Sequence, residues 1–192
     1  MTAVAGEAGR TGAAGEAYVF PLEALSRGRI DVAGGKAANL GELLTAGLPV
    51  PGGFCVTTEA YAVVASGAEL TAVLEALAVT AANDASALER LAAEAREALL
   101  GAPVPEAVAG EVRERYASLG PDVAVAVRSS ATAEDLPGAS FAGQQETYLN
   151  VRGGEAVLEA VRRCWASLWT DRAVAYRARS GIDPRGVRLA VV

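Results

Sequence analysis

Apolar positions recur at the spacing of an α-helix over residues 37–46, 68–119 and 155–179. A glycine directly after the first segment is expected to end that helix, because glycine readily adopts the left-handed conformation found at helix ends. Within the second segment, the pattern Ser86-x-x-Glu89 predicts a capping box. Its apolar stripes carry no reactive groups, so its expected role is packing. In the third segment, a break is expected near Thr170-Asp171, and Arg177 is expected on the helix surface.

Shorter apolar runs, bounded by glycine, proline and polar residues, predict β-strands. The run at the end of the sequence reaches the last residue, so we expect a truncated strand or one that needs further chain to complete it. The predicted strands lie within residues 18–25, Phe54–Val56, Val123–Val127, Gln145–Val151 and Val187–Val192.

The composition indicates a globular protein, because 52% of the 192 residues are hydrophobic. A net charge of −6 disfavours a nucleic-acid partner, whose phosphates require a basic surface. No apolar run approaches the roughly 18 residues of a membrane span. Residues 1–17 are expected to form a flexible leader without a signal peptide. Cys55 and Cys164 lack the spacing of a metal site, so we expect reduced core residues in a cytoplasmic protein.

Lys36 is the only lysine in a chain that otherwise uses arginine, and the chain contains no histidine to act as a general base. It follows Gly34 and Gly35 at an expected helix start, where the helix dipole attracts anions. The motif is not a Walker A loop, because the earlier glycine and the following serine or threonine are missing. Two interpretations of Lys36 are left at this point: a phosphate-binding lysine and an ordinary surface lysine.

The stretch VRSSATAEDLPGASFAGQQET, residues 127–147, combines an arginine with hydroxyl side chains and small residues. Arg128 directly follows an apolar run, so it is expected at the end of a strand, where α/β folds commonly bind ligands. Its planar guanidinium suits phosphate oxygens. The alternative is a solvated arginine or an ion pair with Glu134 or Asp135.

The residues after Arg128 also suit an anion. Ser129, Ser130 and Thr132 offer hydroxyl groups, and the small residues near Gly143 allow close approach of backbone N–H groups. The alternative is a long hairpin connection stabilised by serine and Asx turns. A connection of about 17 residues is longer than a hairpin requires, which favours the anion-binding interpretation.

Four segments together resemble one known family. They are Gly34-Gly-Lys-Ala-Ala-Asn-Leu-Gly41, Val50-Pro-Gly-Gly-Phe54, the stretch 127–147, and CWASLWTDRAVAYR at residues 164–177. In this order and spacing, the chain resembles the N-terminal ATP-binding domain of the phosphoenolpyruvate synthase, pyruvate phosphate dikinase and rifampicin phosphotransferase group. The last segment and the closing LAVV are most similar to the rifampicin phosphotransferases.

The resemblance implies an α+β, ATP-grasp-like fold with a mixed sheet and a helical insertion at about residues 68–119. Residues 18–192 would be the N-terminal part of this nucleotide-binding domain. The resemblance also implies that Lys36 and Arg128 contact phosphate groups, and that Gly143 and Thr147 belong to a loop covering the nucleotide. ATP and Mg²⁺ are the implied cofactors. The metal ligands and adenine contacts are expected outside this chain.

In such enzymes, ATP phosphorylates a histidine on a swivelling domain, which passes the phosphoryl group to pyruvate or rifampicin. The expected partners are that phosphohistidine domain and an acceptor domain, with no nucleic acid and no membrane. Because the chain contains no histidine, we expect it not to complete a phosphoryl-transfer cycle alone. A truncated product, or a stand-alone nucleotide- or anion-binding module without its own catalysis, stays open as an alternative.

Overall fold

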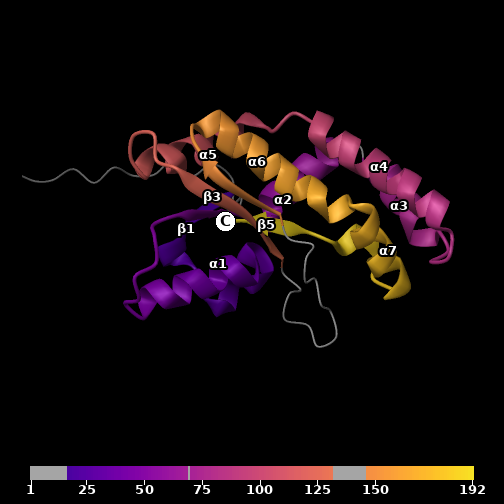
Figure 1. Cartoon of the computed structure of the whole chain (residues 1–192), viewed down its shortest axis with the longest axis horizontal. Helices are drawn as coiled ribbons and strands as arrows, with labels where there is room; N and C mark the ends of the chain where they lie inside the picture. The colour runs from indigo at the N-terminus through magenta and orange to yellow at the C-terminus, as the bar shows by residue number, and fades with distance from the viewer. Residues whose placement is uncertain (1–16, 69, 132–145) are drawn as a thin grey trace, which may run out of the picture.

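The structure, a computed structural model, describes residues 17–68, 70–131 and 146–192. Its centre is a five-stranded sheet with the strand order β1-β2-β5-β3-β4 (Figure 1). Every described pair of neighbouring strands is antiparallel, so the sheet is not mixed in strand direction, whereas the expected α+β class is confirmed. The last strand of the sequence, β5, lies at the centre of the sheet between β2 and β3.

The strands follow the predicted apolar runs, with one important difference. β3 continues through Arg128 instead of ending before it, because Ser129 and Ser130 pair with Val191 and Ala190 of β5. A neighbouring strand that satisfies the backbone can hold polar residues in strand conformation. The strands are β1 Val19–Pro21, β2 Phe54–Val56, β3 Val125–Ala131, β4 Thr147–Val151 and β5 Leu189–Val191.

The first long helix, α1, spans Ile30–Thr45 and therefore begins before the expected start at residue 37. Inside it lies a break at Gly34, whose φ of 71° and ψ of 167° are not helical. This backbone conformation is essentially restricted to glycine. The predicted glycine stop is confirmed: Gly47 has a φ of 75°, and its amide donates to the carbonyl oxygen of Leu44.

Four further helices cover the predicted helical region and the segment before it. Thr57 caps the first of them by accepting a hydrogen bond from the Ala60 amide at 3.3 Å. The predicted capping box at Ser86 is wrong, because Asp84 is the N-cap and accepts from the Ala87 amide at 3.1 Å. The helices are α2 Thr58–Gly67, α3 Thr71–Val79, α4 Ala85–Gly101 and α5 Glu106–Ser118.

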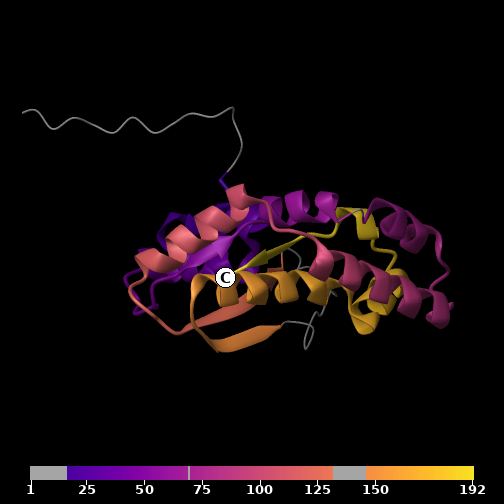
Figure 2. The ribbon, with the colours of Figure 1, turned by 90° about the horizontal axis from the view of Figure 1, so that it is seen from above.

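The helices lie on both faces of the sheet. α1 covers one face, and α6, Gly154–Ala166, covers the other (Figure 1). Seen from above, α3, α4 and α7 extend beyond one end of the sheet (Figure 2). Within the described ranges, no single helix is long and apolar enough to cross a membrane; α2 and α3 would reach that length and composition only as a pair, which is bent by 99°.

Each face of the sheet has its own apolar core. The larger core, on the side of α6, contains Val191 of β5 together with the buried Trp165 and Trp169. The smaller core, on the side of α1, contains Ala190 of β5 and Cys55 of β2. Successive residues of β5 therefore point into different cores, as the alternation of a strand requires. Both cysteines are free and buried, as predicted.

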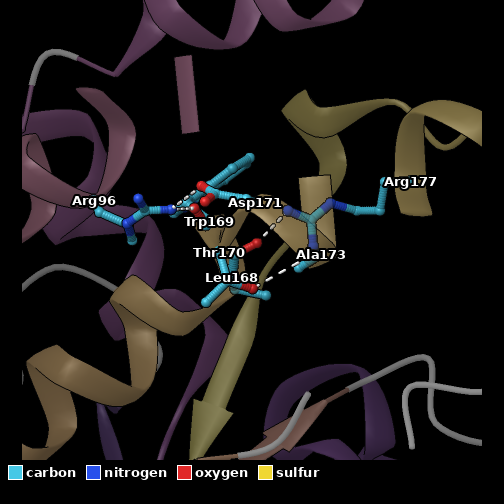
Figure 3. Close-up of polar contacts among 7 residues, drawn as sticks. All are labelled: Arg96, Leu168, Trp169, Thr170, Asp171, Ala173 and Arg177. Atoms are coloured by element: carbon cyan, nitrogen blue, oxygen red, sulfur yellow. Dashed lines mark hydrogen bonds and ion pairs between the residues drawn. The ribbon is translucent and has the colours of Figure 1, made fainter. Parts of the chain in front are cut away.

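The predicted break after α6 is confirmed. A 3₁₀ helix at Ser167–Trp169 follows α6, and α7 then spans Asp171–Arg179. Thr170 caps α7 by accepting from the Ala173 amide at 3.4 Å. Arg96 of α4 holds this junction by donating to the carbonyl oxygen of Trp169 at 2.6 Å and to the carboxylate of Asp171 at 2.8 Å (Figure 3).

Arg177 is buried, which corrects the prediction of a surface position. Its side chain is only 3% exposed, and its guanidinium donates to the carbonyl oxygen of Leu168 (Figure 3). The guanidinium also lies 5.0 Å from the centre of the Trp169 ring, a cation–π contact. Burial lowers the pKa of Arg177 to about 10. The arginine thus belongs to the packing around the α6–α7 junction.

The free energy of unfolding is expected to fall as the pH rises above about 9. Burial raises the pKa of Cys55, Cys164 and Tyr61 to about 12, from 9.0 for the thiols and 10.0 for the phenol. At a pH between the ordinary pKa and the raised pKa of such a group, the unfolded chain binds fewer protons than the folded protein. Each group can therefore remove up to about 1.4 kcal/mol per pH unit. Urea unfolding at a series of pH values measures this decline.

The matched control is the double replacement Cys55→Ala and Cys164→Ala. Without the thiols, the decline from pH 9 is expected to disappear, because above pH 10 the loss from Tyr61 is largely offset by the gain from Arg177. Arg177 acts in the opposite direction above pH 10, because its lowered pKa makes the unfolded chain the better proton binder there. In the unsubstituted protein, a free energy of unfolding that stays constant from pH 9 to 12 contradicts the prediction.

Candidate functional site

Arg128 lies within β3, not at the end of a strand as predicted. Its amide donates to the carbonyl oxygen of Val192 at 2.6 Å, and its carbonyl oxygen accepts from the Val192 amide at 2.8 Å. Its side chain is exposed. Because alternate residues of a strand share a face, Arg128 points to the same side as Ser130, which contacts α1. The guanidinium therefore lies on the α1 side of the sheet.

Thr147 lies directly opposite Arg128 in the β3–β4 pair. Opposite residues of antiparallel strands point to the same face, with Cβ atoms about 5 Å apart. Thr147 is also exposed, so its hydroxyl group and the Arg128 guanidinium border the same surface. The strand register thus brings together two of the predicted site residues, although 18 residues separate them in the sequence.

The glycine break of α1 rests directly on β3. A Cβ atom on Gly34 would lie 2.1 Å from the carbonyl oxygen of Ser130. The Ser130 hydroxyl donates to the carbonyl oxygen of Ala33 at 2.8 Å and accepts from the amide of Ala37 at 3.2 Å. Ser130 therefore bridges both sides of the break, across 93 residues of sequence from Ala37.

Lys36 lies inside this bridged segment, directly before Ala37, and its side chain is half-buried. Since Gly34 is not helical, the second part of α1 starts beside Ser130, and its first amides form the positive end of a helix dipole. The Gly34-Gly35-Lys36 motif and the Arg128 motif, far apart in sequence, are thus in direct contact through Ser130. This geometry places the helical segment that carries Lys36 against β3, the strand that carries Arg128.

The two serines after Arg128 are not available to a ligand, which corrects their predicted role. Ser130 uses its hydroxyl for the bridge to α1. Ser129 is 2% exposed and faces the larger core, and its hydroxyl has no hydrogen-bond partner in the described part of the chain. The cause is that β3 extends through both residues and is covered on both faces. The bridging role of Ser130 has no signal in a single sequence, because its partners are distant in the chain.

Several predicted residues lie outside the described ranges. Gly143 is one of them, as are Thr132, Glu134 and Asp135. The predicted nucleotide-covering loop and the alternative ion pairs of Arg128 therefore stay predictions.

Among the described residues, neither a reactive thiol nor a metal-ligand cluster accompanies the site. Burial raises the pKa of Cys164 to about 12; the charge of Glu146 adds to the rise, and that of Lys36 opposes it. The thiol is therefore not a nucleophile near neutral pH. Over residues 17–68, 70–131 and 146–192, no group of three or more histidine, cysteine, aspartate or glutamate side chains could hold a metal ion.

Replacing Ser130 with alanine is expected to lower the free energy of unfolding by about 2–3 kcal/mol. The change leaves the Ala37 amide without its buried side-chain partner and the Ala33 carbonyl with only the weak thiol donor of Cys55 at 3.6 Å, and an unsatisfied buried group costs about 1–3 kcal/mol. Urea unfolding measures the loss. Ser129→Ala is the matched control, because this neighbouring hydroxyl is equally buried but unpartnered. Equal losses in the two variants contradict the bridging role of Ser130.

These features define an α+β domain in which a glycine-kinked helix places a lysine beside an arginine-bearing strand. Over residues 30–192, the chain matches the family described as "Pyruvate phosphate dikinase, AMP/ATP-binding domain". The chain belongs to this family, which confirms the resemblance seen in the sequence.

Curated relatives carry two kinds of name. The chain is 52% identical to the rifampicin phosphotransferase of Streptomyces sviceus, over 92% of this chain and 21% of the relative. It is 48% identical to a probable phosphoenolpyruvate synthase of Methanothermobacter thermautotrophicus, over 91% of this chain and 26% of the relative. For the phosphoenolpyruvate synthase of Pyrococcus furiosus, the identity is 38%, with the same coverages of 91% and 26%. The chain thus spans about a fifth to a quarter of the length of these relatives.

Proposed function

We propose that the chain is the ATP-binding portion of an ATP-dependent phosphotransferase of the dikinase type. In this proposal, Lys36 and Arg128 bind phosphate oxygens, and Thr147 and Gly143 belong to the segment that covers the nucleotide. The observation that supports it best is the Ser130 bridge, which connects the lysine motif to the arginine strand. Membership of the AMP/ATP-binding family supports the choice of ligand.

The two cationic side chains suit different parts of a phosphate chain. The guanidinium of Arg128 can bind two oxygens at once, whereas the ammonium of Lys36 is a point charge on a flexible stem. Phosphoryl transfer needs little covalent chemistry from the protein and depends on positioning and on stabilising the negative charge. Lys36 and Arg128 would supply that charge stabilisation.

The rest of the proposed reaction needs groups from elsewhere. The chain contains no histidine, so a phosphohistidine intermediate would form on another domain or chain. The described residues also offer no carboxylate cluster for Mg²⁺, and no step proposed for these residues depends on it. We propose pyruvate or rifampicin as the final acceptor, because the relatives include proteins named phosphoenolpyruvate synthase and rifampicin phosphotransferase. The two free cysteines support a reducing compartment such as the cytoplasm.

Calorimetric titration of the purified chain with ATP and with adenosine tests the proposal. Saturable ATP binding, clearly tighter than adenosine binding and weakened by salt, is the expected result, because the proposed contacts are to phosphate groups. Equal affinities for ATP and adenosine, or no saturable binding of ATP, would overturn the proposed site. Formation of AMP from ATP by this chain alone, with pyruvate or rifampicin present, would contradict the need for a separate phosphohistidine domain.

A further inference from the structure

Arg177 is a buried cation without a carboxylate partner in the described part of the chain. The residue is 3% exposed, and none of the ion pairs within residues 17–68, 70–131 and 146–192 includes it. Its guanidinium donates to the carbonyl oxygen of Leu168 and lies 5.0 Å from the centre of the Trp169 ring (Figure 3). A carbonyl oxygen and an aromatic ring carry only partial negative charge, so neither neutralises the guanidinium.

Three other arginines, on α4 and on the chain after α7, do have carboxylate partners. The pairs are Arg96 with Asp171 at 2.8 Å, Arg185 with Asp183 at 2.6 Å, and Arg188 with Glu59 at 3.2 Å. These three arginine side chains are at least 30% exposed, so water solvates them as well. Arg177 has neither form of compensation, although an ion removed from water is strongly disfavoured without a counter-charge.

The helix that carries Arg177 has an excess of positive charge. α7 contains Arg172, Arg177 and Arg179 but only one carboxylate, Asp171, which pairs with Arg96. Burial lowers the pKa of Arg177 to about 10, whereas an adjacent carboxylate would raise it. The surroundings of this guanidinium are therefore short of negative charge.

A small cavity lies beside Arg177, between α3, α4 and α7. Its volume is about 20 Å³, and Arg177 is the one charged side chain among the described residues that line it. Leu77 of α3 and Leu88 of α4 belong to its apolar walls, and the indole N–H of Trp169 already donates to Tyr61 at 3.2 Å. A space of this size holds one particle about as large as a water molecule, so phosphate and sulfate are too large for it.

A halide ion matches both the size and the charge of this space. It consists of a single atom, and it brings the full negative charge that a water molecule cannot supply. A guanidinium is more weakly hydrated than an ammonium. Chloride and bromide are likewise more weakly hydrated than fluoride, so they lose less hydration free energy on entering an apolar cavity.

We propose that the cavity beside Arg177 binds one weakly hydrated halide ion, chloride under physiological conditions, as the counter-ion of the buried guanidinium. The ion would lie where α3, α4 and α7 meet, because residues of all three helices line the cavity. A ligand that binds only the folded protein stabilises it with the logarithm of the ligand concentration above the Kd. The stability of the protein should therefore depend on chloride specifically, and not only on ionic strength.

Thermal unfolding at constant ionic strength tests the site. Sodium fluoride is replaced stepwise by sodium chloride, and the thermal midpoint is expected to rise by about 3–6 °C for each tenfold increase in chloride above its Kd. Arg177→Met removes the charge with little change of volume, so its midpoint should be the same in both salts. Arg96→Met is the matched control: it removes an arginine that has its own carboxylate partner, and the chloride dependence should persist.

Anomalous scattering from crystals grown in sodium bromide locates the ion in the unsubstituted protein, so the test does not depend on the folding of Arg177→Met. The bromine peak is expected in the cavity, between Arg177, Leu77 and Leu88. An empty or water-filled cavity, with bromide only at exposed arginines, would show adventitious ions only and would overturn the proposal. Equal midpoints of the unsubstituted protein in fluoride and chloride, or an equal chloride dependence in Arg177→Met, would also overturn it. No nucleotide is present, so the outcome is independent of the proposed ATP site.

Discussion

Replacing Gly34 with alanine is expected to lower the free energy of unfolding by about 3 kcal/mol or more. Two costs combine. The backbone at Gly34, with φ of 71° and ψ of 167°, is strained for any residue with a side chain by about 1–3 kcal/mol. The new Cβ atom would also lie 2.1 Å from the carbonyl oxygen of Ser130, which is backbone and cannot rotate away. Domains of this kind have about 5–15 kcal/mol in total, so the loss is severe.

Alanine substitutions at three other glycines measure the two contributions separately. A Cβ atom on Gly41 would lie 2.2 Å from the Leu25 carbonyl oxygen, but its φ is ordinary, so Gly41→Ala measures the clash alone. Gly47 has a φ of 75° and open space, so Gly47→Ala measures the backbone strain alone, about 1–2 kcal/mol. Gly101 has neither feature, and Gly101→Ala is expected to change stability by less than about 1 kcal/mol.

Urea unfolding of the four variants gives the comparison. Gly34→Ala is expected to be less stable than Gly47→Ala, with the difference reflecting the contact with Ser130. Equal stabilities of these two variants would show that α1 can move away from β3, which contradicts a rigid connection between the lysine motif and the arginine strand. The experiment therefore tests the framework of the candidate site without any ligand.

Most local elements could be predicted from the sequence because their causes are local. Phe54–Val56 was predicted as a strand from a short apolar run, and the break at Thr170 from a polar pair inside a helical pattern. The start of α1 and the end of β3 were predicted wrongly, since both depend on distant partners. Gly34 takes its conformation against Ser130, and Ser130 is held in a strand by Ala190 of β5.

In the candidate site, too, features with local causes could be predicted, and contacts between distant residues could not. A single lysine after two glycines, and an arginine after an apolar run, could be selected from residue types alone. Their connection through Ser130 could not, because a hydroxyl that bonds to Ala33 and Ala37 looks in sequence like one that bonds to a ligand. The buried Arg177 was missed for a related reason: nothing in its helix indicates that Leu168 and Trp169 will surround it.

Replacing Lys36 with alanine is expected to raise the Kd for ATP about 10- to 100-fold and to leave the Kd for adenosine unchanged. A hydrogen bond to a charged group contributes about 1.5–3 kcal/mol, and each 1.4 kcal/mol changes affinity tenfold. Lys36→Arg keeps the charge and should lose less affinity than Lys36→Ala. The titrations are made by calorimetry, with the thermal midpoint of each variant as a check on folding.

The matched control removes the same charge at a distant position. Arg90 is an exposed residue of α4 whose side chain pairs with Glu94 at 2.7 Å, so Arg90→Ala changes the net charge equally without reaching β3. If Lys36→Ala weakens ATP binding no more than Arg90→Ala does, the lysine has no specific phosphate contact, and the proposed site is wrong. The salt dependence adds a second criterion: loss of a direct phosphate contact should flatten the dependence of ATP affinity on ionic strength, because one charge pair fewer is left to screen.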